Sequence, residues 1–188
     1  RGRGFSAGEK LHRAGLYYIT AERMQEHGEP ERKIIYSKAL ECYELSRKYK
    51  KENVTRVEIP YGDSHISAIY MKADTGNAKT PVVVMMNGLD STKELLYGTP
   101  VAEKLRKRGV SVLCVDQPGT GEALRLQNLT AVYNTEIWAA PIIDWLYQQP
   151  EIDTNNIGAL GVSLGGYYAP RAVAFELRFT CGSVLGAN

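Results

Sequence analysis

The pattern of apolar and polar positions changes character near residue 54. Before that point, apolar side chains recur every three or four positions in two stretches separated by Gly28, a spacing typical of amphipathic helices. Ser6 followed by Glu9 fits a capping box at the start of the first helix. Pro30 suits the first turn of the second, where a missing N–H costs nothing. The pattern predicts a helical hairpin over residues 6–51.

After residue 54, short apolar runs alternate with stretches of helical spacing. Residues 55–61 and 65–73 alternate in the strand manner on either side of Gly62-Asp63, which predicts a β-hairpin. Continuous apolar runs, typical of strands covered on both faces, follow at 81–86, 110–116, 156–162 and 180–187. Helical stretches lie between them, at about 92–108, 130–148 and 164–178. The alternation predicts an α/β fold with a mostly parallel sheet, in which residues 54–188 form one domain and 1–53 a helical segment before it.

Polar residues follow three of these apolar runs. Because the carboxyl ends of parallel strands meet at one edge of a sheet, side chains there are candidates for function. Ser163 follows the run at 156–162. The acidic and basic residues near the other two ends are candidates for substrate binding: Asp90, Lys93, Glu94, Asp116 and Glu122.

Ser163 stands in the sequence "GVSLGG", directly between an apolar run and a helical stretch. A strand that turns sharply into a helix needs small neighbours around the central residue, and Gly161 and Gly165 supply them. Such a nucleophile elbow exposes the serine hydroxyl at the start of a helix. The backbone N–H of Leu164, and that of Leu89 beside Gly88, would then donate to an oxyanion.

Composition narrows the classes of partner. The chain has 188 residues, enough for one good core, with 44% apolar residues and a formal net charge of +2. This charge gives no reason to expect nucleic acid as a partner, and no stretch approaches the roughly 18 apolar residues of a membrane span. Cysteine and histidine never occur at metal-ligand spacing. We expect a cytoplasmic protein without a membrane partner, a metal or an organic cofactor.

Four motifs together resemble the FrsA-like group of the α/β-hydrolase superfamily: "AGLYYITAERM", "NGLDSTKE", "DQPGTGE" and "GVSLGGYYAPRA". The resemblance implies the first two-thirds of an α/β-hydrolase core preceded by a helical cap. It also implies Ser163 as nucleophile and the Leu89 and Leu164 N–H groups as oxyanion hole. In this fold the triad acid and histidine follow the serine on later loops. No histidine follows Ser163, so we expect both beyond Asn188, in a longer enzyme.

The favoured interpretation is a serine hydrolase that acts on a small-molecule carbonyl substrate through an acyl-enzyme. The bond attacked is an ester, an amide or a carbon–carbon bond next to a ketone. A non-catalytic binding or regulatory protein on a hydrolase scaffold is the alternative. A peptidase of the prolyl-oligopeptidase type is a third interpretation, against which the helices at 6–51 argue. A chain that ends at a strand edge also makes a homodimer an open possibility.

Overall fold

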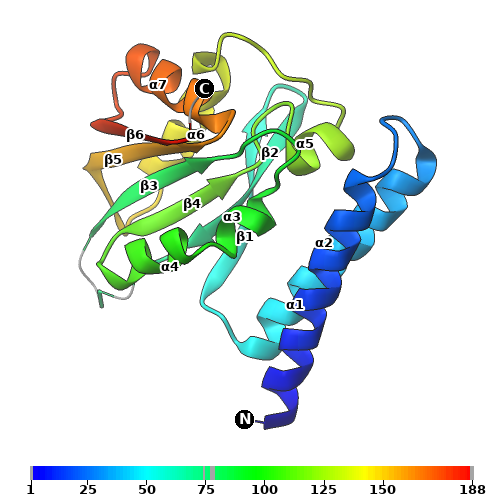
Figure 1. The fold of residues 1–188 in the computed structure, drawn as a ribbon. Coiled ribbons are helices and arrows are strands. Elements are labelled where there is room, and N and C mark those ends of the chain that lie inside the picture. The colour runs from blue at the N-terminus through cyan, green and yellow to red at the C-terminus, as the bar shows by residue number, and fades with distance from the viewer. Residues whose placement is uncertain (1, 74, 77–78, 187–188) are drawn as a thin grey trace. The chain divides into compact units, whose positions relative to one another are not determined.

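The chain folds into two compact units, Arg1–Val54 and Thr55–Asn188. This is seen in a computed structural model, which describes all residues except 1, 74, 77–78 and 187–188. The first unit is helical and the second contains a six-stranded sheet (Figure 1). Ala187, the last residue of the strand predicted at 180–187, lies outside the described residues.

The first unit is a hairpin of α1 (Gly2–Arg23) and α2 (Pro30–Lys50). Close approach of the two helices is possible because Gly15 has no side chain: a Cβ there would lie 2.8 Å from the ring of Tyr43. Ser46 Oγ donates to the carbonyl of Gly8 at 2.9 Å. The helix α1 already begins at Gly2, so the predicted capping box at Ser6 is wrong, because Ser6 lies inside the helix.

The second unit starts within β1 (Val54–Tyr61), which is followed by β2 (Ser64–Met71) and β3 (Thr80–Met86). The strands β4 (Ser111–Val115), β5 (Ile152–Val162) and β6 (Cys181–Leu185) complete the sheet. Their order in the sheet is β1-β2-β4-β3-β5-β6. The strand β2 is antiparallel to β4, whereas β4, β3, β5 and β6 run parallel to one another. The predicted α/β class with a mostly parallel sheet is therefore confirmed.

Helices cover both faces of this sheet (Figure 1). Val84 and Met86 belong to one apolar cluster with Trp138 of α6 (Glu136–Tyr147) and Ala172 of α7 (Gly165–Phe175). Side chains that alternate with these along a strand point to the opposite face. There Met85 is buried, as are Leu96 of α3 (Lys93–Tyr97) and Ala102 of α4 (Pro100–Lys107). Burial on both faces explains why β3 and β4 are continuous apolar runs. The same expectation was wrong for the run at 180–187, because β6 is exposed along its length.

The register brings three loops to one edge of the sheet. Met86 at the end of β3 is level with Val115 of β4 and with Gly161 of β5. Val162 in turn is level with Leu185 of β6. The segments that follow β3, β4 and β5 therefore start side by side, and they contain the candidate residues.

Two predicted helices differ from the structure. The helix expected at 92–108 is two helices, α3 and α4, because Gly98 ends the first and Pro100 starts the second with Thr99 as its N-cap. The helix expected at 130–148 begins only at Glu136. A short helix, α5 (Gly121–Arg125), was not predicted and follows β4.

Candidate active site

Ser163 occupies a sharp turn between β5 and α7. Its φ is 53°, in the left-handed region that non-glycine residues seldom adopt. The Ser163 N–H donates to the carbonyl of Leu185 at 2.9 Å, and its carbonyl accepts from the N–H of Gly166 at 2.7 Å. The turn is thus fixed on one side by β6 and on the other by the first turn of α7. A left-handed serine costs on the order of 1–2 kcal/mol, which these bonds and the surrounding glycines must offset.

The glycines of this turn are required by close contact between backbones. A Cβ on Gly161 would collide with the carbonyl oxygen of Gly165, and a Cβ on Gly165 would collide with the carbonyl oxygen of Met86. Ser163 itself is exposed. The N–H groups at the start of a helix have no partner within it, and Leu164 is the N-cap residue of α7. Ser163 therefore lies exposed in a sharp strand-to-helix turn, at the start of α7.

The β3–α3 loop, Asn87–Thr92, lies directly against this turn. A Cβ on Gly88 would lie 3.0 Å from the Cβ of Ser163 and 3.4 Å from its Oγ. Leu89 is the next residue and is 67% exposed, so it is not part of the core. Asp90 has a φ of 56°, and its carbonyl accepts a bond from Arg125 at 3.4 Å. The structure thus brings the loop that contains Leu89 against the turn that contains Ser163 and Leu164.

Four of the five charged candidates form one buried group with Lys93 at its centre. The Lys93 ammonium lies 2.9 Å from Glu94, 2.9 Å from Asp116 and 2.8 Å from Glu122. Lys93 and Asp116 are fully buried, and the other two nearly so. Arg56 of β1 adds a second cation, whose Nη2 lies 2.6 Å from Glu122. We call Arg56, Lys93, Glu94, Asp116 and Glu122 the Lys93 cluster.

The electrostatics of the Lys93 cluster favour a charged lysine. Burial alone would lower the pKa of Lys93, but Asp116, Glu94 and Glu122 raise it above its usual value. Burial acts to raise the pKa of Glu122, yet Lys93 and Arg56 bring it below its usual range. Burial raises the pKa of Asp116, and the Lys93 ammonium opposes this. Paired cations and hydrogen bonds are what make so many buried charges tolerable.

Two residues that sequence reasoning missed complete this region, Asn87 and Gln117. The side chain of Gln117 accepts from the Asn87 N–H at 3.0 Å and donates to the Asn87 carbonyl at 2.8 Å. Asn87 Nδ2 donates to Asp116 Oδ1 at 2.8 Å. Both residues come directly after apolar runs, at the edge where function was expected. Their polar side chains at the ends of buried strands were the available signal.

The three histidines make contacts of their own. His12 and His27 belong to the helical hairpin, where His12 makes an edge contact with Tyr43 and His27 lies 3.5 Å from Arg32. His65 is on β2, and its Nε2 lies 2.8 Å from Gln127. The contacts found for these histidines do not place any of them as a base for Ser163.

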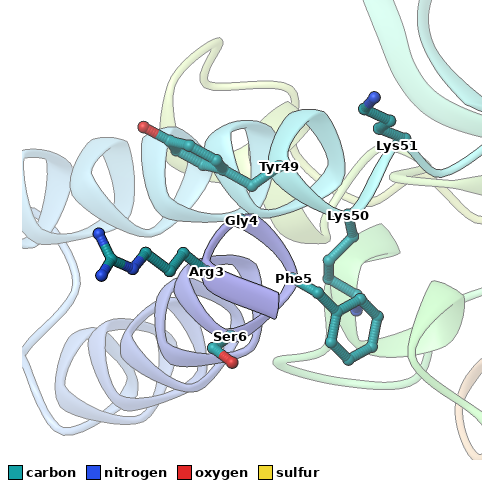
Figure 2. Close-up of a pocket in the computed structure, with 7 residues that line it drawn as sticks. All are labelled: Arg3, Gly4, Phe5, Ser6, Tyr49, Lys50 and Lys51. Carbon is teal, nitrogen blue, oxygen red and sulfur yellow. The ribbon is translucent and has the colours of Figure 1, made fainter. Parts of the chain in front are cut away.

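A pocket lies within the helical hairpin. It is lined by the first turns of α1 and the end of α2, as Figure 2 shows: Arg3, Gly4, Phe5, Ser6, Tyr49, Lys50 and Lys51. The ammonium of Lys50 is already paired with Glu9 at 3.0 Å and with Glu52 at 2.7 Å. Across the described residues there is neither a helix long and apolar enough to cross a membrane nor a metal-binding group of three or more histidine, cysteine or acidic side chains.

The sheet order, the helices on both faces and the turn at Ser163 define an α/β-hydrolase fold. A solved structure of 2,6-dihydroxy-pseudo-oxynicotine hydrolase superposes with a TM-score of 0.81 and 27% identity, over 95% of this chain and 49% of that one. The family model for FrsA-like esterases matches residues 2–187. The chain belongs to the FrsA-like esterase family.

Curated relatives of this chain are longer proteins. The 2,6-dihydropseudooxynicotine hydrolase of Paenarthrobacter nicotinovorans is 28% identical over 182 residues, which are 94% of this chain and 46% of that protein. Hydrolase LUC6 of a Fusarium species is 32% identical over 173 residues, 86% of this chain and 41% of that protein. The chain therefore spans less than half the length of these relatives.

Proposed function

We propose that this chain supplies the nucleophile and the oxyanion hole of a serine hydrolase. The observation that carries the proposal is the left-handed Ser163, exposed at the start of α7 and in contact range of Gly88. Two separate segments thus meet at one hydroxyl, one able to present the N–H of Leu164 and the other that of Leu89. Two such donors are what a tetrahedral oxyanion requires.

In the proposed reaction, the Oγ of Ser163 forms a bond to the carbonyl carbon of the substrate while its proton passes to a general base. The carbonyl oxygen becomes an oxyanion, which the Leu89 and Leu164 N–H groups stabilise. When the intermediate collapses, the bond to the leaving group breaks and that group takes the proton from the base. Water then hydrolyses the acyl-enzyme by the same steps.

The general base is proposed to be a histidine, oriented by an aspartate or glutamate, that other parts of the protein supply. Serine is a weak nucleophile without such a base. The histidines of this chain contact Tyr43, Arg32 and Gln127. The relatives, of which this chain covers less than half, have ample further length for these two residues.

The substrate is proposed to be a small molecule with an ester, an amide or a carbon–carbon bond next to a ketone. The names of the relatives support a hydrolase of small molecules, because one is a 2,6-dihydropseudooxynicotine hydrolase and others are α/β-hydrolases. Neither a metal nor an organic cofactor takes part in the proposed steps. A cytoplasmic location and a homodimer stay predictions.

The proposal is tested with Ser163→Ala in the complete protein that contains this sequence. We expect hydrolysis of p-nitrophenyl acetate to fall by at least about 1,000-fold, because the nucleophile is lost, while the circular dichroism spectrum is unchanged. Ser6→Ala, an exposed serine inside α1, is the matched control and keeps wild-type activity. Turnover by Ser163→Ala within tenfold of wild type would refute the proposal and favour a non-catalytic scaffold.

A further inference from the structure

The carboxylate of Asp116 joins three segments of the active-site edge. Its Oδ1 accepts from Asn87 Nδ2 at 2.8 Å and from the Lys93 N–H at 2.6 Å. Its Oδ2 accepts from Lys93 Nζ and from the Glu122 N–H, both at 2.9 Å. Asn87 begins the β3–α3 loop and Lys93 follows its last residue. One side chain therefore holds both ends of the loop that carries Leu89.

Asn87 shows that this arrangement is specific. Its Nδ2 donates to Asp116 and to the carbonyl of Val115, whereas its Oδ1 is buried and no described residue donates to it. A flipped amide would place that oxygen against two acceptors, so the orientation is fixed by the network. A buried acceptor without a donor costs about 1–3 kcal/mol. Because Asn87 is buried despite this cost, we infer that its role is to donate its two hydrogen bonds.

The contacts leave no capacity in the Lys93 ammonium or the Asp116 carboxylate to bind a substrate. An ammonium group has three donors, and that of Lys93 faces three carboxylates, those of Glu94, Asp116 and Glu122. A carboxylate has about four acceptor positions, and Asp116 accepts four bonds. Gly121 also lies so close to Asp116 that a Cβ on Gly121 would collide with the Asp116 carboxylate.

We propose that Asp116 is a positioning residue that fixes the β3–α3 loop, through Asn87 and Lys93, so that the Leu89 N–H points at the oxyanion beside Ser163. This inference rests on the proposed function, because it assigns the loop to the oxyanion hole. Asp116 acts on the reaction through the loop and not by touching the substrate. A misplacement of about 1 Å in such a group can cost roughly 100-fold in rate.

The experiment compares Asp116→Asn and Asn87→Ala with the wild-type complete protein, using p-nitrophenyl acetate as the probe. We expect each variant to lose about 100-fold in kcat with KM within about threefold of wild type, at a temperature where both are folded. Glu176→Gln is the matched control. Its side chain is also largely buried and ion-paired, with Arg178 at 2.6 Å, but it lies at the far end of α7. We expect the Glu176→Gln variant to have a lower free energy of unfolding and an unchanged kcat.

Two results would overturn the positioning role of Asp116. A kcat within threefold of wild type in the folded variants would show that Asp116 only stabilises the fold. A raised KM with unchanged kcat would show substrate contact, and either result overturns the proposal. If Asp116→Asn fails to fold, Asn87→Ala alone decides, since it removes donated bonds without unbalancing the buried charges. If the wild type itself neither hydrolyses the probe nor forms a fluorophosphonate adduct at Ser163, it is the proposed function that fails.

Discussion

The two segments that meet at Ser163 are stabilised in different ways. The turn at Gly161–Gly166 is held by backbone: its bonds run to Leu185 and within the first turn of α7, and its glycines let main chains approach. The β3–α3 loop is held by side chains that are distant in sequence, above all Asp116. At Gly161 and Gly165 the turn has no room for a side chain. The loop instead depends on polar partners, whose loss would misplace it without removing it.

The largest effect is expected from Gly161→Ala, which disrupts the packing of the turn at Ser163. The new Cβ would collide with the carbonyl oxygen of Gly165, a backbone atom that no rotamer change can move. We expect the free energy of unfolding to fall by about 3 kcal/mol or more, with loss of turnover. Urea denaturation of the complete protein measures this. Stability within 1 kcal/mol of wild type would contradict the account of a turn packed backbone to backbone.

A smaller effect is expected from Gly88→Ala, at the contact between the two segments. The new Cβ would lie 3.0 Å from Ser163 Cβ and 3.1 Å from the Val162 carbonyl, so the loop must shift by a few tenths of an ångström. We expect kcat to fall roughly tenfold, with a change in unfolding free energy below about 1 kcal/mol.

Gly4→Ala is the control for this experiment, because the nearest atom to its Cβ would be the carbonyl oxygen of Tyr49 at 3.7 Å. It lies within α1, where alanine is the better helix former. Steady-state kinetics and thermal melting of both variants check the prediction. Equal kinetics in the two variants would argue that Gly88 is not in contact with Ser163.

The smallest effect is expected from Glu176→Gln, at the end of α7 opposite Ser163. Hydrogen bonds from Arg178 lower the pKa of Glu176 below its ordinary 4.5, although burial opposes this. A lowered folded-state pKa contributes stability above the unfolded pKa, and this is lost as pH falls through the folded value. Glu176→Gln should therefore reduce the unfolding free energy by about 1 kcal/mol at pH 7 and by much less near pH 3. An equal loss at both pH values, measured in urea, would contradict this.

The sheet could be predicted from sequence because its signal is local. Strands buried on both faces must be apolar throughout, and the runs at 81–86, 110–116 and 156–162 were found for that reason. The helix predicted at 92–108 was wrong in its continuity, because Gly98, Thr99 and Pro100 end one helix and cap the next within three residues. Apolar spacing is similar on both sides of such a break.

The turn at Ser163 was likewise visible in the sequence, since its glycines are neighbours of the serine. The partners of the β3–α3 loop were not. Asn87 and Asp116 are 29 positions apart, and Arg56 reaches Glu122 across 66. Only the register of β3 against β4 brings Asn87 to Asp116. Sequence pattern indicated charged residues at the correct edge, but it could not show that they bind one another.

The most direct test of the central claim is the mass of the complete protein after incubation with a fluorophosphonate, followed by mapping of the labelled peptide. The account predicts a single adduct on the peptide that contains Ser163, formed by the wild type and absent from Ser163→Ala. No adduct, or an adduct at another residue that persists in Ser163→Ala, would contradict the claim that this serine is the nucleophile of a hydrolase.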